Sequence, residues 1–276
     1  MLREDSPILV ATDLQPGSDD ALREGHERAS TLGVKLIVCH VLERSEPIEV
    51  GAEQLRERVR ELTGRDHGDL EVILAEGAPA EMIVELATRR GAGLIVVGPG
   101  RTRVIGDTTG KVIRHAHCAV LVARPPVSSG LVLACTDFSD GSFPALVSGA
   151  SEAQRVGGDL VAVHVVPVDT MVETDVMGMS TAMAPVITDD LRRSAETRLA
   201  EVLAKRRIHG RACALGGEAS AQILRVAQAL PARLVVVGTH GRTGWRRFFV
   251  GSVAEHVAHT APCSVLIERL SPTLAS

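Results

Sequence analysis

Aromatic residues are nearly absent from this chain. Phenylalanine, tryptophan and tyrosine together make up 2% of its 276 residues, and there is no tyrosine. Proteins that bind single-stranded nucleic acids stack the bases on aromatic side chains. Duplex binders need an excess of basic residues, and the formal net charge of this chain is −4. The composition therefore disfavours a nucleic-acid partner.

Long apolar runs and paired cysteines are missing as well. No segment approaches the roughly 20 uninterrupted apolar residues that cross a bilayer, and the start, MLREDSPILVATD, does not resemble a signal peptide. The five cysteines form no C-x-x-C pair and lie mostly within Val, Leu and Ala runs. This pattern favours buried thiols in a reducing compartment over a zinc site. We expect a cytoplasmic protein with no membrane partner.

The chain does contain one long pattern written twice. The matching pairs are 8–13 with 131–137, 35–43 with 159–167, 81–98 with 221–238, and 115–124 with 260–269. The length of the chain suits two ordinary domains, and self-similarity at this spacing predicts two copies of one domain. We expect a first domain over 1–126 and a second over 131–276, with PPVSSG at 125–130 as the linker.

Changes in the offset between the copies locate their differences. Asp13 and Asp137 are 124 residues apart, the fourth apolar runs 140 apart, and the last runs 145 apart. The second copy therefore gains 16 residues within 168–189 and five more in the glycine-rich loop that ends at Gly251.

Each copy alternates short, β-branched apolar runs with longer stretches of helical period. Strands are expected near 7–13, 35–42, 70–74, 93–98 and 118–123, and near 131–137, 159–166, 211–215, 233–238 and 263–268. Continuously apolar runs such as LIVVG are typical of parallel strands covered on both faces. The sequence predicts two doubly wound α/β domains, each with a five-stranded parallel sheet and helices on both faces.

The loop GTHGRTGWRRFFVGS, 238–252, leaves the fourth strand of the second copy. Ser252 and Glu255 fit an S-x-x-E capping box, so a helix is expected to begin at Ser252. A strand, a glycine loop and a helix N-terminus together form an anion site, because free N–H groups and the helix dipole point at the ligand. The alternative is a solvated surface loop. GDTTGKV, 106–112, is one residue short of a Walker loop, and no G-x-G-x-x-G follows a first strand.

The spacing Gly238-x-x-Gly241, nine residues, then Gly251-Ser252, between VVV and APCSVLIE, resembles the ATP-binding signature of the universal stress protein A family. The strand ends TD and HV agree with that family, and the resemblance covers nearly the whole chain as two tandem copies. It implies a Rossmann-like fold of the adenine nucleotide alpha hydrolase type, with ATP as ligand and Mg²⁺ as its candidate companion. The residues that it implies are Thr136, Asp137, Val165, Val237, Gly238, Gly241, Arg242, Gly251, Ser252 and Val253.

Several of these residues have a structural alternative. Asp137 is expected at the base or ribose, or else as the cap of the next helix. Val165 would offer backbone contacts to adenine, whereas the neighbouring His164 is favoured as a hydrogen-bonded core histidine. The methionine-rich insertion 168–189 is expected to be a linker leading into the next helix, with a flap or a partner-docking surface as the alternative.

The first copy departs from the signature. Seven residues separate Gly98 from Gly106, where twelve separate Gly238 from Gly251. Asp107 replaces Ser252, and we expect this carboxylate to cap the helix and to fill the phosphate position with the protein's own charge. Asp13 and Val41 are retained, which leaves adenosine-sized binding open. Nucleotide binding is therefore expected in the second copy and a degenerate loop in the first.

The sequence singles out no catalytic residue and no metal ligands. The first hypothesis for function is ATP binding by a stress-response regulator without efficient turnover. The second is slow ATP hydrolysis or autophosphorylation, in which Asp137 or a bound metal organises the phosphates, and the third is a nucleotide-independent interaction protein. The resemblance further implies that the edge strands near CAVLVA and CSVLIE pair within one molecule as a pseudo-dimer. A protein partner and a further homodimer remain open.

Overall fold

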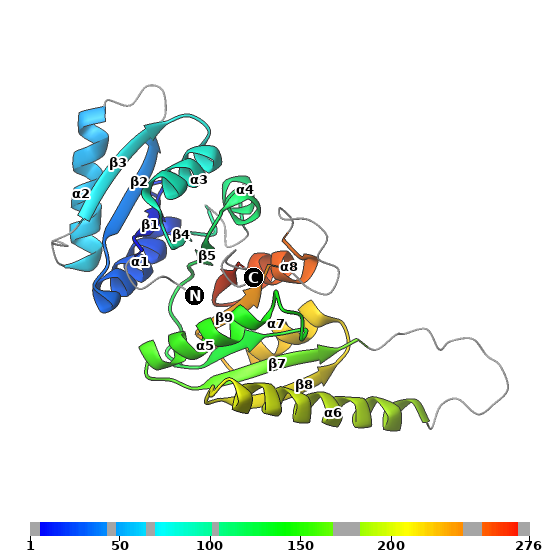
Figure 1. Ribbon diagram of the computed structural model, residues 1–276. Helices are drawn as coiled ribbons and strands as arrows, with labels where there is room; N and C mark the ends of the chain where they lie inside the picture. Colours follow the sequence, from blue (N-terminus) through cyan, green and yellow to red (C-terminus); the bar gives the residue numbers. More distant parts are fainter. Residues whose placement is uncertain are drawn as a thin grey trace.

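The computed structural model describes residues 6–42, 48–64, 70–100, 105–167, 183–239 and 250–269. These residues form ten strands in one sheet, in the order β3-β2-β1-β4-β5-β10-β9-β6-β7-β8 (Figure 1). In the N-terminal half the strands are β1 (Ile8–Ala11), β2 (Leu36–Leu42), β3 (Leu70–Glu76), β4 (Leu94–Val97) and β5 (Ala119–Val122). In the C-terminal half they are β6 (Val132–Cys135), β7 (Leu160–Val166), β8 (Arg211–Gly216), β9 (Leu234–Gly238) and β10 (Ser264–Glu268).

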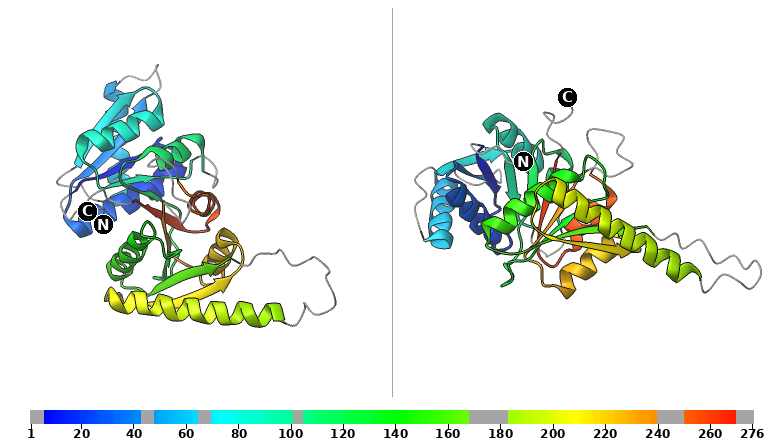
Figure 2. Two further views of the ribbon diagram at one scale, coloured as in Figure 1. Left: turned by 45° about the vertical axis from the view of Figure 1, so that its right-hand side comes forward. Right: turned by 60° about the horizontal axis from the view of Figure 1, so that its bottom comes forward.

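Eight α-helices cover this sheet on both faces, in two layers. One layer contains α1 (Asp19–Leu32), α2 (Ile48–Thr63), α5 (Phe143–Arg155) and α6 (Met183–Lys205). The other layer contains α3 (Pro79–Arg90), α4 (Asp107–His115), α7 (Ala219–Ala229) and α8 (Ser252–Thr260). A single 3-10 turn, η1 (Pro16–Ser18), precedes α1. Figure 2 shows α6 running along the outer side of the C-terminal half.

Alternation along the strands builds one core on each face. Ile8 and Val10 of β1 face α1 and α2, while Leu9 and Ala11 face α3 and α4. Because both faces are covered, all four residues of β1 are buried, as the continuously apolar runs predict. All strands within each half are parallel, and their bounds lie within two residues of the predicted ones. The predicted fold class is confirmed.

The two halves join through their edge strands. β5 and β10 pair antiparallel, with Leu121 opposite Leu266. These two leucines occupy equivalent positions of the two copies, 145 residues apart, so an approximate twofold axis passes between them. Residues 123–131, which include the expected linker, contain no helix or strand. The expectation that the two edges pair within one molecule is confirmed.

Two arginines reinforce this junction reciprocally. Arg124, which follows β5, is 4% exposed and donates to the carbonyl oxygens of Ala258 (2.5 Å) and His259 (3.4 Å) in the last turn of α8. Arg269, which follows β10, donates to the carbonyl oxygens of Ile113 and Arg114 at the end of α4. The last carbonyls of a helix lack partners within it and carry its negative end. Each half therefore caps a helix of the other.

A buried ion cluster crosses the junction on the opposite face. Arg28 of α1 is 2% exposed, pairs with Glu24, and donates to Glu152 of α5 at 2.9 Å. Arg155, Glu27 and Arg233 complete the cluster through contacts of 2.8 to 3.7 Å, which gives three carboxylates and three guanidinium groups in all. Positions 28 and 152 are equivalent in the two copies, 124 residues apart. Equivalent positions of the two copies, near the approximate twofold axis, therefore hold side chains of opposite charge, Arg28 and Glu152.

The charges of this cluster determine the protonation of its members. Burial alone raises the pKa of the Glu152 carboxyl, but the nearby guanidinium groups of Arg28 and Arg155 outweigh burial, and the pKa lies below its ordinary value. Burial alone lowers the pKa of Arg28, and the carboxylates of Glu152 and Glu24 bring it above its ordinary value. Both groups are therefore charged at neutral pH.

The two remaining sequence expectations concern the insertion 168–189 and membrane-spanning segments. The insertion 168–189 leads into α6, which begins at Met183, and residues 168–182 lie outside the described residues. Within the described part of the chain, no helix is both long enough and apolar enough to cross a membrane.

We predict that Arg28→Met strongly destabilises the fold. It would leave the buried Glu24 and Glu152 without their main partner, and breaking a buried pair in this way costs about 3–5 kcal/mol of unfolding free energy. Urea unfolding followed by circular dichroism measures the change. Arg193→Met is the control, because the Arg193–Asp190 pair is fully exposed to solvent and its loss is expected to change little. Equal effects of the two substitutions would contradict the prediction.

The pH dependence of stability gives a second test of the cluster. A lowered pKa means that folding favours the Glu152 carboxylate, so its contribution is present above the unfolded carboxyl pKa of about 4.3 and is lost as the pH falls through the folded pKa. We expect Glu152→Gln to destabilise the protein most at pH 7 and progressively less below about pH 4, because a protonated glutamate resembles glutamine. Urea unfolding of both proteins across this range measures the difference, which a pH-independent gap would contradict.

Candidate functional site

A cavity of about 240 Å³ opens at the carboxyl end of the sheet in the C-terminal half. It lies between β6 and β9, where the strand order reverses, which is the position at which open α/β sheets bind ligands. Its lining comes from four neighbouring segments: the ends of the strands, the turn after β6, the start of α7 and the start of α8. The lining residues are Cys135, Thr136, Asp137, Ser142, Val163, Val165, Ala219, Ile223, Val237, Gly238, Gly251, Ser252, Val253 and Ala254.

The turn after β6 is fixed by its own hydroxyl groups. The Thr136 hydroxyl lies 2.7 Å from that of Ser142 and accepts a hydrogen bond from the Phe138 N–H at 3.0 Å. The Asp137 carboxylate accepts hydrogen bonds from the N–H and the hydroxyl of Ser139. α5 is capped at Ser142, so the alternative that Asp137 caps this helix is wrong. Asp137 is half-buried at the rim of the cavity.

His164 behaves as the structural alternative predicted. It is buried, and its Nδ1 lies 2.8 Å from the carbonyl oxygen of Thr136, which ties β7 to the end of β6. His40 makes the same contact with Thr12 in the N-terminal half, at 2.9 Å. Neither the geometry nor the cavity lining gives His164 a ligand role, whereas the next residue, Val165, lines the cavity.

Gly238 is required by the fold itself. A Cβ at this position would lie 2.7 Å from the carbonyl oxygen of Gly141 and 3.0 Å from the Cα of Ser142, which is closer than side-chain carbons approach backbone atoms. The equivalent Gly98 would bring a Cβ within 2.5 Å of the Gly17 carbonyl oxygen. The close approach of the turn to the fourth strand therefore explains both glycines without a ligand.

Gly251 has no such explanation. Its backbone is extended, with φ −61° and ψ 145°, which any residue adopts, and a Cβ there would lie 3.5 Å from the Thr239 carbonyl oxygen in ordinary contact. The space beyond this position belongs to the cavity. Neither the backbone conformation nor the packing requires a glycine at this position on the rim of the cavity. A glycine here is consistent with a ligand that comes close to the backbone.

The start of α8 corrects two expectations. The helix begins at Ser252 as predicted, but Gly251 is its N-cap and no side chain caps it, so Ser252 and Glu255 do not form a capping box. The N–H of Gly251 donates to the Thr239 carbonyl at 2.8 Å and is not available to a ligand. The N–H groups of Ser252, Val253 and Ala254 precede the first intrahelical hydrogen bond, which Glu255 donates to the Gly251 carbonyl, and these three residues line the cavity.

Eight of the ten predicted site residues line this one cavity. The other two, Gly241 and Arg242, lie outside the described residues, as do His240, Arg246 and Arg247. Sequence reasoning missed the wall formed by Ala219 and Ile223 of α7 and by Cys135 at the strand end. The only signal for α7 was its helical period, which predicts a buried face but not that this face borders a cavity.

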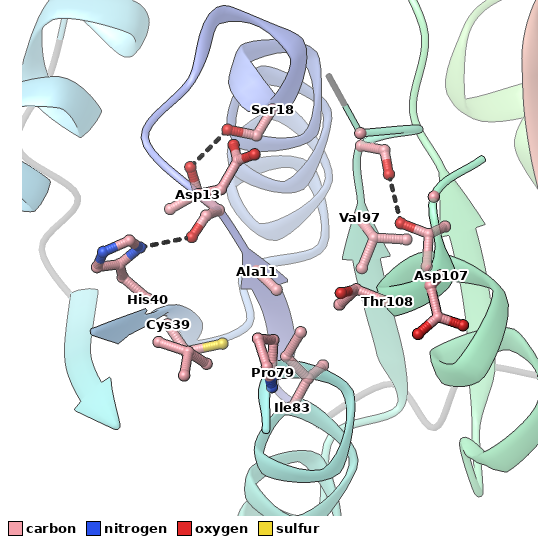
Figure 3. A pocket seen from close by; sticks show the side chains of 16 residues that line it. Ala11, Asp13, Ser18, Cys39, His40, Pro79, Ile83, Val97, Asp107 and Thr108 are labelled. Atoms are coloured by element: carbon pink, nitrogen blue, oxygen red, sulfur yellow. Dashed lines mark hydrogen bonds between the residues drawn. The ribbon is translucent and has the colours of Figure 1, made fainter. Parts of the chain in front are cut away.

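The N-terminal half has an equivalent cavity of about 300 Å³, shown in Figure 3. Its lining residues are Ala11, Thr12, Asp13, Ser18, Cys39, His40, Val41, Pro79, Ile83, Val97, Gly98, Gly100, Gly106, Asp107, Thr108 and Thr109. The turn after β1 repeats the hydroxyl contact, with Thr12 and Ser18 2.7 Å apart. The degenerate loop of the first copy thus coexists with an open cavity.

Asp107 does not act as predicted. Gly106 is the N-cap of α4, and Asp107 is the first helical residue, ion-paired with Lys111 at 2.6 Å. Its side chain is 74% exposed. Because it stands at the rim, it lines the cavity without filling it. The effect of this residue on a ligand is therefore electrostatic and not steric.

The cysteine thiols that line the two cavities are poor nucleophiles at neutral pH. Burial raises the pKa of the Cys135 thiol to about 12, and that of Cys39 likewise to about 12, so both are neutral thiols at physiological pH. Among the residues that the structure describes, no group of three His, Cys, Asp or Glu side chains is placed to hold a metal ion.

Comparison with known proteins identifies the family. The model of the universal stress protein family matches residues 6–124 and again 130–269. The chain belongs to the universal stress protein family. It is a tandem member, because both halves match.

Known proteins resemble most or nearly all of the chain. A universal stress protein from Mycobacterium tuberculosis is 30% identical over 219 residues, which cover 74% of this chain and 69% of that protein. One from Mycolicibacterium smegmatis is 26% identical over 95% of this chain and 96% of its own length. A protein of Pseudomonas aeruginosa of unknown function shares the fold, with a TM-score of 0.71 at 22% identity, over 96% of this chain and 92% of its own.

We predict that the two glycines of this universal stress protein site respond differently to alanine. Gly238→Ala forces backbone apart and should cost about 1–3 kcal/mol of unfolding free energy, as overpacking does. Gly251→Ala should cost less than about 1 kcal/mol, the difference between two N-cap residues. Thermal and urea unfolding of the two variants measure this, and a Gly251→Ala protein as unstable as Gly238→Ala would show that Gly251 is also required by the fold.

Proposed function

We propose that this universal stress protein is a cytoplasmic, ATP-binding regulator of the stress response. In this proposal the domain 131–276 binds ATP in its cavity, and nucleotide occupancy changes the affinity for a protein partner. The domain 1–126 carries the degenerate loop. The observation that carries the proposal is the cavity at the strand-order reversal, where a nucleoside-sized space is lined by the first residues of α8.

The geometry of β7 supports the proposed position of adenine in the cavity. Val163 accepts a hydrogen bond from the N–H of Thr136, so every second residue of β7 points its backbone groups toward β6. β6 ends at Cys135, and Val165 therefore points its N–H and C=O past the end of that strand. These two groups match the donor and acceptor on one edge of adenine. Ile223 and Val237 would supply apolar contact with the ring, and Asp137 would accept from the ribose hydroxyls.

The phosphate end rests on the start of α8. The N–H groups of Ser252 and Val253 are at the positive end of the helix, where anions are stabilised. Gly251 would let phosphate oxygens approach the backbone, and the Ser252 hydroxyl is exposed beside it. Gly241 and Arg242 are proposed contacts along the phosphates on the strength of their positions in the sequence. Mg²⁺ would accompany the nucleotide, held mainly by its phosphate oxygens.

Binding without efficient turnover is the favoured form of the proposal. Among the described residues that line the cavity, only Asp137 and Cys135 are ionisable. Cys135 is a neutral thiol, and in this proposal Asp137 accepts hydrogen bonds from the ribose at the end of the cavity away from the phosphates. A general base needs a lone pair directed at the proton that it abstracts.

Long incubation with ATP and Mg²⁺ should therefore leave ATP intact, whereas accumulating ADP would favour the slow ATPase hypothesis.

We predict that the freshly purified protein releases an adenine nucleotide detectable by mass spectrometry, and that Gly251→Ala lowers ATP affinity about 10-fold, or 1.4 kcal/mol, by isothermal titration calorimetry. The added methyl group would stand between the backbone and the phosphates. Gly106→Ala is the matched control, because Gly106 is the N-cap of α4 in the other half and a Cβ there would meet nothing closer than 4.0 Å, against 3.5 Å at Gly251.

Equal ATP affinity in the wild type and Gly251→Ala, with no nucleotide released, would favour the third hypothesis of a nucleotide-independent interaction protein. Size-exclusion chromatography with and without ATP addresses the proposed further homodimer.

A further inference from the structure

The nucleoside halves of the two cavities are nearly identical. In each half a threonine and a serine hydroxyl lie 2.7 Å apart at the turn after the first strand, with an aspartate carboxylate at its rim. Val41 and Ile83 occupy the positions of Val165 and Ile223. Figure 3 shows Asp13 and His40 on the β1 and β2 side, with Asp107 and Thr108 opposite, on α4. The threonine, serine, aspartate, valine and isoleucine at the nucleoside end of one cavity are therefore present in the other as well.

The phosphate halves differ in charge. The first three residues of α4 are Asp107, Thr108 and Thr109, and those of α8 are Ser252, Val253 and Ala254. Asp107 sets a second carboxylate at the rim of a cavity that already has Asp13. Its partner Lys111 is about half exposed and does not line the cavity, so water screens their attraction and a negative charge remains at the rim. A phosphate at the α4 N-terminus would meet a like charge.

The phosphate halves also differ in their connections. The Thr109 hydroxyl is buried and donates to the Gly98 carbonyl oxygen at 2.9 Å, which fixes the first turn of α4 to the end of β4. Ala254 holds the equivalent position in α8 and has no side-chain donor. The connection between strand and helix is five residues shorter in the N-terminal half. The start of α4 is therefore held against β4 with less chain available to enclose phosphates.

We propose that the N-terminal cavity is a second ligand site that takes an uncharged purine nucleoside in preference to its phosphates. Val41, Ile83 and Val97 would contact the base, and Asp13 would accept from the ribose. Asp107 is the residue that excludes phosphates, while the neighbouring Thr108, which also lines the cavity, would hydrogen-bond the 5′-hydroxyl of a nucleoside. The inference rests on the proposed function for the way a nucleoside is held. The inference adds that one chain binds both a nucleotide and the corresponding nucleoside, each in its own cavity.

The test is a reciprocal exchange in the full-length chain, titrated with ATP and with adenosine. Asp107→Ser should raise the ATP stoichiometry from one to two per chain. Ser252→Asp should lower ATP affinity at the C-terminal site at least about 10-fold and leave adenosine affinity unchanged. Both proteins should fold, because the Asp107–Lys111 pair is exposed and an acidic residue in the first turn of α8 favours the helix dipole.

Photolabelling with 8-azidoadenosine locates the second site. With saturating ATP present, the label should appear on peptides from 6–42 or 70–100, identified by mass spectrometry, and excess adenosine should remove it. Two ATP molecules bound to the wild type, unchanged ATP stoichiometry in Asp107→Ser, or no N-terminal label would each overturn the inference. Failure of the proposed function looks different, because the wild type would then bind no ATP while the N-terminal peptides could still be labelled.

Discussion

The antiparallel pairing of β5 with β10 is the constraint on which the rest of this structure depends. It joins two five-stranded sheets into one, with Leu121 opposite its own equivalent, Leu266. An antiparallel junction reverses the strand direction from one half to the other. The carboxyl ends of the strands therefore point in opposite directions in the two halves. The two cavities lie at opposite ends of the strands of the common sheet. Both cavities remain open to solvent because neither lies at the junction.

The same pairing explains why the helices at the two sites are rigidly supported. α4 and α8 each present an N-terminus to a cavity and a C-terminus to the junction, where Arg269 and Arg124 respectively bind the last carbonyls. Arg114 of α4 also pairs with Glu255 of α8 at 2.9 Å. Each helix is thus held by the half to which it does not belong. The buried cluster around Arg28 and Glu152 holds α1 to α5 on the other face in the same manner.

Much of this could be read from the sequence, and the failures have physical causes. Continuous apolar runs located the strands because strands buried on both faces are built almost entirely from apolar residues, and the family resemblance implied which edges join. The capping box at Ser252 failed because the pattern S-x-x-E does not specify which residue is extended, and Gly251 takes that conformation. The Arg28–Glu152 pair could not be foreseen, since its members are 124 residues apart and a single charge on a helix is usually solvated.

Gly238 and Gly251 show why a glycine pattern is weak evidence until packing is known. Both belong to one signature, yet the fold alone requires Gly238, through the backbone of Gly141, and leaves Gly251 unexplained. The equivalent Gly98 and Gly106 repeat this division. A duplicated chain supplies its own comparison here, because the two halves have the same fold. Asp107 against Ser252 and Thr109 against Ala254 are differences at the helix N-termini that line the two cavities, and so they bear on what each cavity holds.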